Sequence, residues 1–207
     1  SLLNTYEAYL IENDFLLKET FDYSKIELIG DTIHYRNVKA KHIVFAEGFG
    51  MHSNPFFKYL PLDGTKGELF IIKAPELDID VIINTSVFIL PLGNDLFKVG
   101  ATYNWQDKTN LPTEEAKQEL IERIQEIISC DFKIVEHFAG IRPTVKDRRP
   151  LLGTHPKYNS IHILNGLGTR GVMLAPAMAM QLYHHIESNK TLDKTIDISR
   201  YASLLPQ

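Results

Sequence analysis

The sequence is poor in cysteine, with Cys130 alone among 207 residues. A lone cysteine excludes a disulfide within the chain and a metal cluster built on cysteines, and it suits the reducing cytoplasm. The sequence also lacks an apolar run near the ~20 residues that a membrane-spanning helix needs. Its first residues do not have the charged and then apolar pattern of a secretory signal. We therefore expect a cytoplasmic protein without a membrane span.

The sequence has no excess of basic residues either. Its net charge is -4 and the two signs are interspersed, so we expect no nucleic-acid partner. What it does contain is a balanced globular composition, with 44% hydrophobic and 23% charged residues. A chain of this length can bury a sizeable core, which predicts one or two globular domains.

Histidines are present, but not in the spacing of a metal site. His155, His162, His184 and His185 form no H-E-x-x-H motif and no comparable set of ligands. The adjacent His184 and His185 would point to different faces of a helix. We therefore expect no metal.

The most informative stretch is a glycine cluster between an apolar run and a helical pattern. A strand is expected at residues 161–164, followed by Gly166, Gly168 and Gly171, and a helix from Val172 to His185 or Ile186. Glycines let backbone N–H groups approach a ligand closely, and a helix adds its positive N-terminal end. This pattern favours an anionic or electron-rich oxygen at residues 168–172.

The three glycines also spell G-x-G-x-x-G, the dinucleotide fingerprint. That fingerprint needs an acidic residue about 20 positions later, at the end of a second strand. Glu187 and Asp193 lie near that distance, but neither follows a convincing strand. A small NAD-binding module is thus the weaker interpretation, and a turn that only lets strand and helix pack closely remains an alternative.

The other elements predict an α+β fold with a mixed, largely antiparallel sheet and a covering helix. Helices are expected at residues 2–11 and 113–129, the second with Thr113 as its N-cap. Short turns such as Gly93-Asn94 separate the central strands, which favours antiparallel pairing. The expected strands are 15–21, 26–29, 33–35, 39–45, 67–73, 81–84, 87–90, 96–101 and 132–138.

Taken together, several motifs resemble one family. A G-x-R-P motif within residues 139–143 and a D-x-x-P-x-x-G motif at residues 147–153 precede the strand and glycine turn. This order resembles the C-terminal signature of the FAD-dependent glycine oxidase and D-amino-acid oxidase family. The segments Val87-Phe-Ile-Leu-Pro, Val99-Gly-Ala-Thr and Ile43-Val-Phe-Ala-Glu-Gly also look like strands of that family. The resemblance covers nearly the whole chain.

The resemblance implies the C-terminal part of a flavoprotein. In that family the fingerprint glycines lie near the N-terminus, before anything present here. Residues 1–50 and 139–207 are then expected to be parts of a Rossmann-like FAD-binding domain, and residues 51–138 the substrate-binding domain. The expected partners are a small amino acid or amine and a missing N-terminal FAD-binding segment or chain. FAD would be bound noncovalently, because Thr144 and its neighbours offer no cysteine to tether it.

Arg142 is the strongest candidate site residue. It precedes Pro143, which favours an extended backbone, and a planar guanidinium matches a carboxylate with two hydrogen bonds. From the residues alone, an ion pair with Asp147 in the same segment is an equal alternative. The resemblance favours the first role, since the family's G-x-R-P arginine binds the substrate carboxylate.

The remaining site residues follow from the resemblance. Tyr103 and Phe88 fall where the family lines its substrate pocket, although an aromatic residue in a strand is commonly part of the core. Phe88 has no hydroxyl to hold a carboxylate, which favours a substrate with an apolar group over glycine. The residues expected to contact the flavin are Gly48, Gly166, Gly168, Thr169, Arg170, Gly171, Val172 and Met173.

The function implied is an FAD-dependent oxidoreductase that oxidises the C–N bond of an amino acid or related amine by hydride transfer. No acid-base residue is required. The alternative is a catalytically silent fragment, or a subunit that needs a separate FAD-binding chain. On either hypothesis we expect the isolated chain to be inactive.

Overall fold

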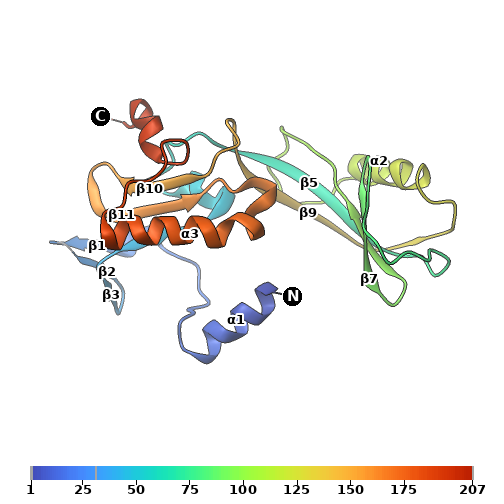
Figure 1. The fold of residues 1–207 in the computed structure, drawn as a ribbon, viewed down its shortest axis with the longest axis horizontal. Coiled ribbons are helices and arrows are strands. Elements are labelled where there is room, and N and C mark those ends of the chain that lie inside the picture. Colours follow the sequence, from blue (N-terminus) through green and yellow to red (C-terminus); the bar gives the residue numbers. More distant parts are fainter. Residues whose placement is uncertain (1, 31, 207) are drawn as a thin grey trace. The chain divides into compact units, whose positions relative to one another are not determined.

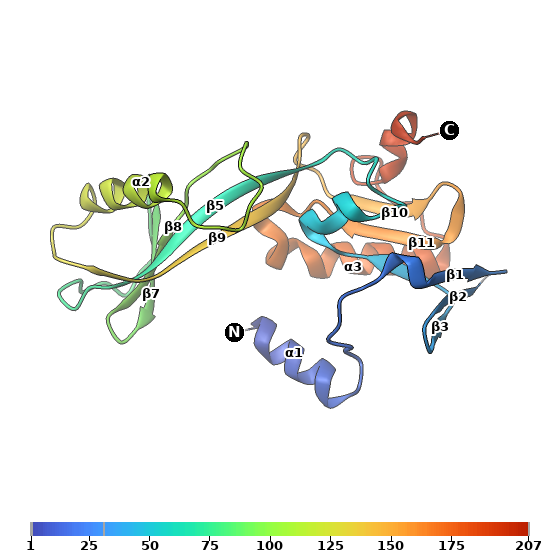
Figure 2. The same ribbon diagram turned by 180° about the vertical axis from the view of Figure 1, so that it is seen from behind.

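The computed structural model describes residues 2–30 and 32–206, which divide into two compact units at His42/Ile43. The first unit contains a helix and a three-stranded antiparallel meander, β1-β2-β3, as expected (Figures 1 and 2). Its elements are α1 (Leu2–Glu12), a 3-10 turn (Tyr23–Lys25), β1 (Ile26–Ile29), β2 (Thr32–Tyr35) and β3 (Val38–Ala40).

Two strand predictions for this part of the chain are wrong. Residues 15–21 form no strand, because none of the described strands pairs with them; the Phe21 ring instead stacks on the Tyr35 ring, with 4.4 Å between the ring centres. The single strand expected at residues 39–45 is two strands, β3 and β4. β3 pairs with β2, whereas β4 (Ile43–Phe45) runs parallel to β11 (Tyr158–Asn165) in the second unit.

The second unit contains a five-stranded antiparallel sheet in the order β6-β7-β8-β5-β9. Its strands are β5 (Leu62–Lys73), β6 (Ile83–Asn84), β7 (Phe88–Gly93), β8 (Leu96–Gly100) and β9 (Lys133–Val145). One helix, α2 (Glu114–Gln125), covers one face of this sheet (Figure 1). The expected α+β class, with a largely antiparallel sheet and a covering helix, is therefore confirmed.

The core of this sheet lies on the α2 face. Leu120 and Ile124 of the helix pack against Phe70, Ile72 and Val99 of the sheet, and all five are fully buried. Each such side chain stabilises the fold by roughly 1.5–3 kcal/mol relative to exposure. As predicted, the Thr113 hydroxyl caps α2 by accepting a hydrogen bond from the Ala116 N–H.

A smaller sheet, β10-β11-β4, carries the glycine turn. β10 (Leu151–His155) is antiparallel to β11, and a 3-10 turn (Gly168–Arg170) leads from β11 into α3 (Gly171–Ser188). Leu182 of α3 packs on Leu152, with Leu192 and Ile196 beside them. Two further 3-10 turns are Gly48–Ser53 and Ile198–Leu204. The predicted order of strand, glycine turn and helix is thus confirmed.

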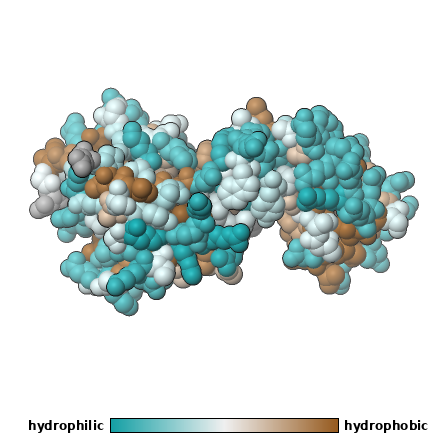
Figure 3. All heavy atoms as spheres, turned by 90° about the horizontal axis from the view of Figure 1, so that it is seen from above, coloured by the Kyte–Doolittle hydropathy of each residue, from teal (hydrophilic) through white to brown (hydrophobic). Residues whose placement is uncertain are grey.

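Hydrophilic residues cover much of the face in Figure 3, with smaller hydrophobic patches among them. Within residues 2–30 and 32–206, no helix combines the length and apolar character needed to cross a membrane.

Candidate functional site

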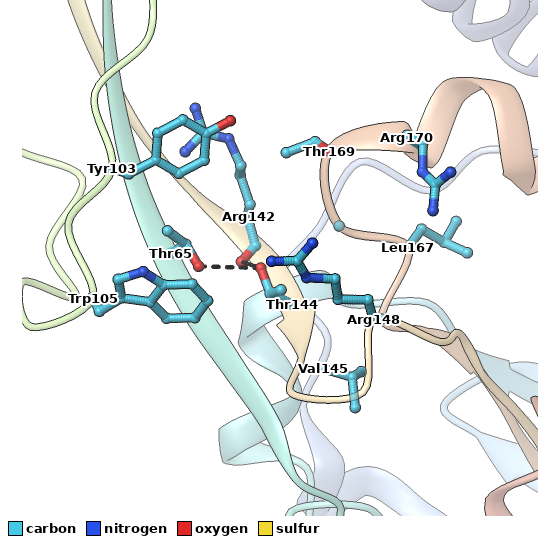
Figure 4. A pocket seen from close by; sticks show the side chains of 12 residues that line it. Thr65, Tyr103, Trp105, Arg142, Thr144, Val145, Arg148, Leu167, Thr169 and Arg170 are labelled. Carbon is cyan, nitrogen blue, oxygen red and sulfur yellow. Dashed lines mark hydrogen bonds between the residues drawn. The ribbon is translucent and has the colours of Figure 1, made fainter.

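A cleft of about 530 Å³ lies where β5 and β9 approach the glycine turn (Figure 4). Five segments contribute: the strands β5 and β9, the loop that follows β8, the turn that follows β9, and the turn before α3. The lining residues are Thr65, Tyr103, Trp105, Arg142, Thr144, Val145, Arg148, Gly166, Leu167, Gly168, Thr169 and Arg170.

Arg142 lies within β9, opposite Thr65 of β5. Its guanidinium carbon is 4.6 Å from the centre of the Tyr103 ring, and one of its nitrogens donates to the Thr102 carbonyl at 3.4 Å. The guanidinium lies over Gly67, where a Cβ would be 2.1 Å from the nearest guanidinium nitrogen. The side chain therefore occupies space that only a glycine at position 67 leaves open.

The alternative ion pair between Arg142 and Asp147 is wrong. Asp147 instead accepts hydrogen bonds from the Arg200 Nε at 3.1 Å and the Tyr201 hydroxyl at 2.7 Å. Partial burial on its own would raise the pKa of Asp147, but hydrogen bonds from the Arg149 N–H, Tyr201 and Arg200 outweigh it and lower the pKa. Asp147 thus fixes the segment after β9 to the 3-10 turn at Ile198–Leu204.

Two aromatic side chains form a wall of the cleft. Tyr103 and Trp105 are 63% and 54% exposed, and both come from the loop between β8 and α2. Asn104, between them, pairs with Lys66 through two backbone hydrogen bonds of 2.8 and 2.9 Å. The wall is therefore attached to the edge of β5.

The glycine turn forms the opposite side. Gly166 and Gly168 have φ values of +70° and +57°, which favour glycine. Asn165 anchors the turn, since its side chain accepts from the Gly166 N–H at 2.8 Å and donates to the Gly48 carbonyl at 2.9 Å. A Cβ on Gly168 would meet nothing within 4 Å. The α3 N-cap, Arg170, makes no side-chain hydrogen bond to the helix, so a ligand can approach these amides.

The electrostatic character of the cleft is positive. Arg142, Arg148 and Arg170 line it, and none of the described lining residues carries a carboxylate. Arg148 has a left-handed backbone, with φ of 57°, and its side chain extends toward Thr144 (Figure 4). The α3 N-terminus adds to this positive potential. The arrangement suits one or two anionic or electron-rich groups.

The structure brings most of the predicted site residues together. Arg142, Tyr103, Gly166, Gly168, Thr169 and Arg170 all line the cleft. Gly171, Val172 and Met173 form the first turn of α3 just beyond the lining, and Gly48 is connected to the turn through Asn165.

Phe88 lies outside the lining but on the same face of the sheet as Arg142. The cross-strand pairs run from Phe88 to Gly100, from Gly100 to Leu69 and from Leu69 to Phe138. Paired residues share a face, and Arg142 lies four residues beyond Phe138 on β9, so it faces the same way. This face is opposite the one covered by α2. It therefore presents apolar groups next to the guanidinium.

Sequence reasoning missed the contributions of Thr65, Trp105, Thr144 and Arg148. The lone tryptophan was a usable signal, since exposed aromatics in loops are commonly functional. By contrast, nothing in the sequence Asp147-Arg-Arg-Pro distinguishes Arg148 from its neighbour Arg149.

Two of these histidines, His162 and His185, join elements of the fold. Thr154 Oγ1 lies 2.9 Å from His162 Nδ1 and 3.2 Å from His185 Nε2, which joins β10, β11 and α3. No group of three or more potential metal ligands occurs among the residues that the structure describes.

Comparison with known proteins places this geometry in a family context. The family described as "FAD dependent oxidoreductase" matches residues 19–184. Glycine oxidase of Bacillus subtilis is 26% identical over 185 residues, which are 83% of this chain and 50% of that protein. The chain thus spans about half the length of the curated relatives it matches first.

Solved structures show the same fold. The structure of glycine oxidase from Bacillus cereus has a TM-score of 0.66 at 18% identity, covering 84% of this chain and 50% of that one. The L-α-glycerophosphate oxidase of Mycoplasma pneumoniae, solved with FAD bound, has a TM-score of 0.64 at 20% identity, covering 83% and 50%.

Proposed function

Because the chain belongs to the family of FAD-dependent oxidoreductases, we propose that it forms the substrate-facing part of an enzyme that oxidises the C–N bond of an amino acid or related amine. FAD is the cofactor of this family. When bound, FAD supplies the acceptor for the hydride that leaves the substrate carbon next to nitrogen. The resulting imine is then hydrolysed by water.

The observation that carries the proposal is the position of Arg142. Its guanidinium is exposed to a cleft of positive character and rests on Gly67 and Tyr103 rather than on a carboxylate of its own. A substrate carboxylate can therefore accept two charge-assisted hydrogen bonds from it. Those bonds fix the carboxylate, and with it the direction of the substrate's reacting C–H bond. Tyr103 and Trp105 line this side of the cleft and would contact a substrate bound there.

The residues of the glycine turn fit the cofactor. The open space at Gly168, the left-handed turn and the uncapped start of α3 support an electron-rich flavin edge at residues 166–173. Charge that gathers on the flavin would be stabilised by the helix N-terminus and by Arg170 or Arg148. We propose that residues 139–207 and 1–50 belong to the FAD-binding domain and residues 51–138 to the substrate domain, with FAD held noncovalently.

The substrate is proposed to carry an apolar group. Leu69, Phe88 and Phe138 share the sheet face of Arg142, and Phe138 is 43% exposed. A carboxylate at Arg142 would thus place its neighbouring side chain next to apolar surface. Phe88 itself cannot donate a hydrogen bond, so its proposed role is to contact that side chain.

We further propose that the chain needs an FAD-binding segment, joined to it or supplied by a separate chain. On this view the isolated 207-residue chain is colourless and inactive. A flavin band retained by that chain alone after gel filtration would overturn this part of the proposal.

The proposed function is tested on the protein complemented with its FAD-binding segment. Under anaerobic conditions, amino acids and amines are screened for bleaching of the flavin absorption band, with Arg142→Met as the matched variant. We expect bleaching by amino acids with apolar side chains, and a rate at low substrate at least roughly tenfold slower in the variant. A flavin-loaded protein that none of these compounds reduces, or that Arg142→Met leaves equally active, would overturn the proposal.

A further inference from the structure

Lys66 is a buried lysine that the cleft does not use directly. Its side chain is 1% exposed and lies on the α2 side of the sheet, because residues 65 and 67 face the cleft and position 66 alternates away. Its ammonium donates to the Asp107 carboxylate, the Leu111 carbonyl and, at 3.4 Å, the Thr109 hydroxyl. Glu68 Oε1 lies 3.3 Å away.

The ammonium is charged in this environment. Burial on its own would lower the pKa of Lys66, but the contacts with Asp107 and Glu68 outweigh burial and raise it. In turn the hydrogen bond from Lys66, together with hydrogen bonds from Thr109, lowers the pKa of Asp107 to about 2. A buried charge of this kind persists only with its partners in place.

Most of these partners belong to one segment, residues 101–113, defined here as the wall loop. Asp107, Thr109 and Leu111 lie in its second half, whereas Tyr103 and Trp105 lie in its first half and line the cleft. The backbone pair between Asn104 and Lys66 is the point at which the loop crosses the edge of β5.

The far end of the wall loop is attached to the same strand. The Glu68 carboxylate accepts from the Thr113 N–H at 2.9 Å and from the Thr113 hydroxyl at 3.0 Å, and His137 Nε2 lies 2.8 Å from it. Thr102, at the near end, hydrogen-bonds Glu68 through its backbone at 3.2 Å. The two ends are thus secured by Glu68 and the middle by Lys66.

We propose that Lys66 is a positioning residue of the cleft: from the opposite face of β5, its ammonium holds the wall loop so that Tyr103 and Trp105 stand beside Arg142. Loss of that charge would release the middle of the loop while the sheet persists. That Tyr103 and Trp105 contact a substrate rests on the proposed function. That Lys66 holds the wall loop in place does not.

A second lysine, Lys108, contributes less to holding the wall loop. Lys108 donates to the Asp63 carboxylate at 2.7 Å, to the Trp105 carbonyl at 2.7 Å and to the Gly64 carbonyl. Its side chain is about a third exposed, so water can replace these bonds when it is removed. We expect Lys108→Met to loosen the loop less than Lys66→Met.

The test is hydrogen exchange measured by mass spectrometry on the full 207-residue chain, without flavin or substrate. In Lys66→Met, amides of residues 102–113 should exchange roughly tenfold faster or more, because their opening no longer breaks a buried ion pair. Amides of β9 should keep their protection. Trp105, the only tryptophan, should show a larger fast component in its fluorescence anisotropy decay.

Two further variants complete the experiment. Lys117→Met removes a partly exposed lysine whose ion pair with Glu114 lies on α2, and it should leave the wall loop unchanged. Asp107→Asn is used if Lys66→Met does not fold, and it should loosen the loop in the same way. The proposal is overturned if folded Lys66→Met, or Asp107→Asn in its place, exchanges as the wild type does. It is equally overturned if both variants lose protection throughout the sheet, since Lys66 would then stabilise the fold rather than the loop.

Discussion

Substitution of Gly67 by alanine should impair carboxylate binding without touching a charged residue. A Cβ at position 67 would lie 2.1–2.3 Å from three atoms of the Arg142 guanidinium group. Those atoms are the far end of a flexible side chain, so the arginine moves and the backbone does not. Gly67 does not have a positive φ, and alanine therefore fits the strand itself.

The expected magnitude follows from the hydrogen bonds lost. Charge-assisted hydrogen bonds contribute about 1.5–3 kcal/mol, which corresponds to a loss in affinity of roughly 10- to 150-fold. Gly67→Ala should lose nearly as much affinity as Arg142→Met, while the free energy of unfolding changes by less than about 1 kcal/mol. The assay is a titration with benzoate, a rigid carboxylate with an apolar group. Binding is measured by the change in Trp105 fluorescence.

The chain contains a matched control. Gly140 is the direct cross-strand partner of Gly67, and a Cβ there would meet nothing within 4 Å. Gly140→Ala should therefore bind benzoate within roughly twofold of the wild type. If Gly67→Ala and Gly140→Ala bind benzoate equally well, the close contact between Gly67 and Arg142 does not position the guanidinium, and the reasoning is refuted.

Three other predictions concern stability. Burial lowers the pKa of His155 below 6.5, so the unfolded chain binds this proton more readily than the folded chain as the pH falls below about 6.5. The melting temperature should therefore decrease below that pH. His155→Phe should flatten this part of the plot of melting temperature against pH. Asp147→Asn should cost about 1 kcal/mol or less in urea unfolding at neutral pH, because its hydrogen bonds with Arg200 and Tyr201 are partly exposed. The lowered pKa of Asp147 means that this difference shrinks as the pH falls below about 4. Thr113→Ala should cost about 1–2 kcal/mol, since the α2 cap is lost and the Glu68 carboxylate loses a donor; an unchanged urea midpoint would contradict this.

Sequence patterns predicted the elements that depend on interactions between residues close together in the chain. The strand, glycine turn and helix from Tyr158 to Ser188 and the capped helix α2 follow from hydrophobic periodicity, glycine spacing and a threonine at the N-cap. The G-x-R-P motif also singled out Arg142, which lines the cleft. The sequence could not show that Gly67 makes room for it, because these residues are 75 positions apart and meet only through the pairing of β5 with β9.

The contacts of the wall loop could not be predicted from the sequence either. Nothing near Lys66 in the sequence indicates that its ammonium is buried under Asp107, Thr109 and Leu111, since that contact forms only when the loop crosses β5. The wrong strand at residues 15–21 has a related origin. Its apolar residues suggested a strand, but a strand forms only where a neighbouring strand pairs with its backbone groups.

The central claim is that the cleft holds a substrate carboxylate on Arg142 beside a flavin at the glycine turn. The most direct test is a visible difference spectrum recorded while benzoate is titrated into the FAD-loaded protein, complemented with its FAD-binding segment. The account predicts a saturable shift of the flavin bands in the wild type, with the midpoint moved to at least roughly tenfold higher benzoate in Arg142→Met. A shift that is identical in the two proteins would contradict it, as would saturable benzoate binding that leaves the flavin spectrum unchanged.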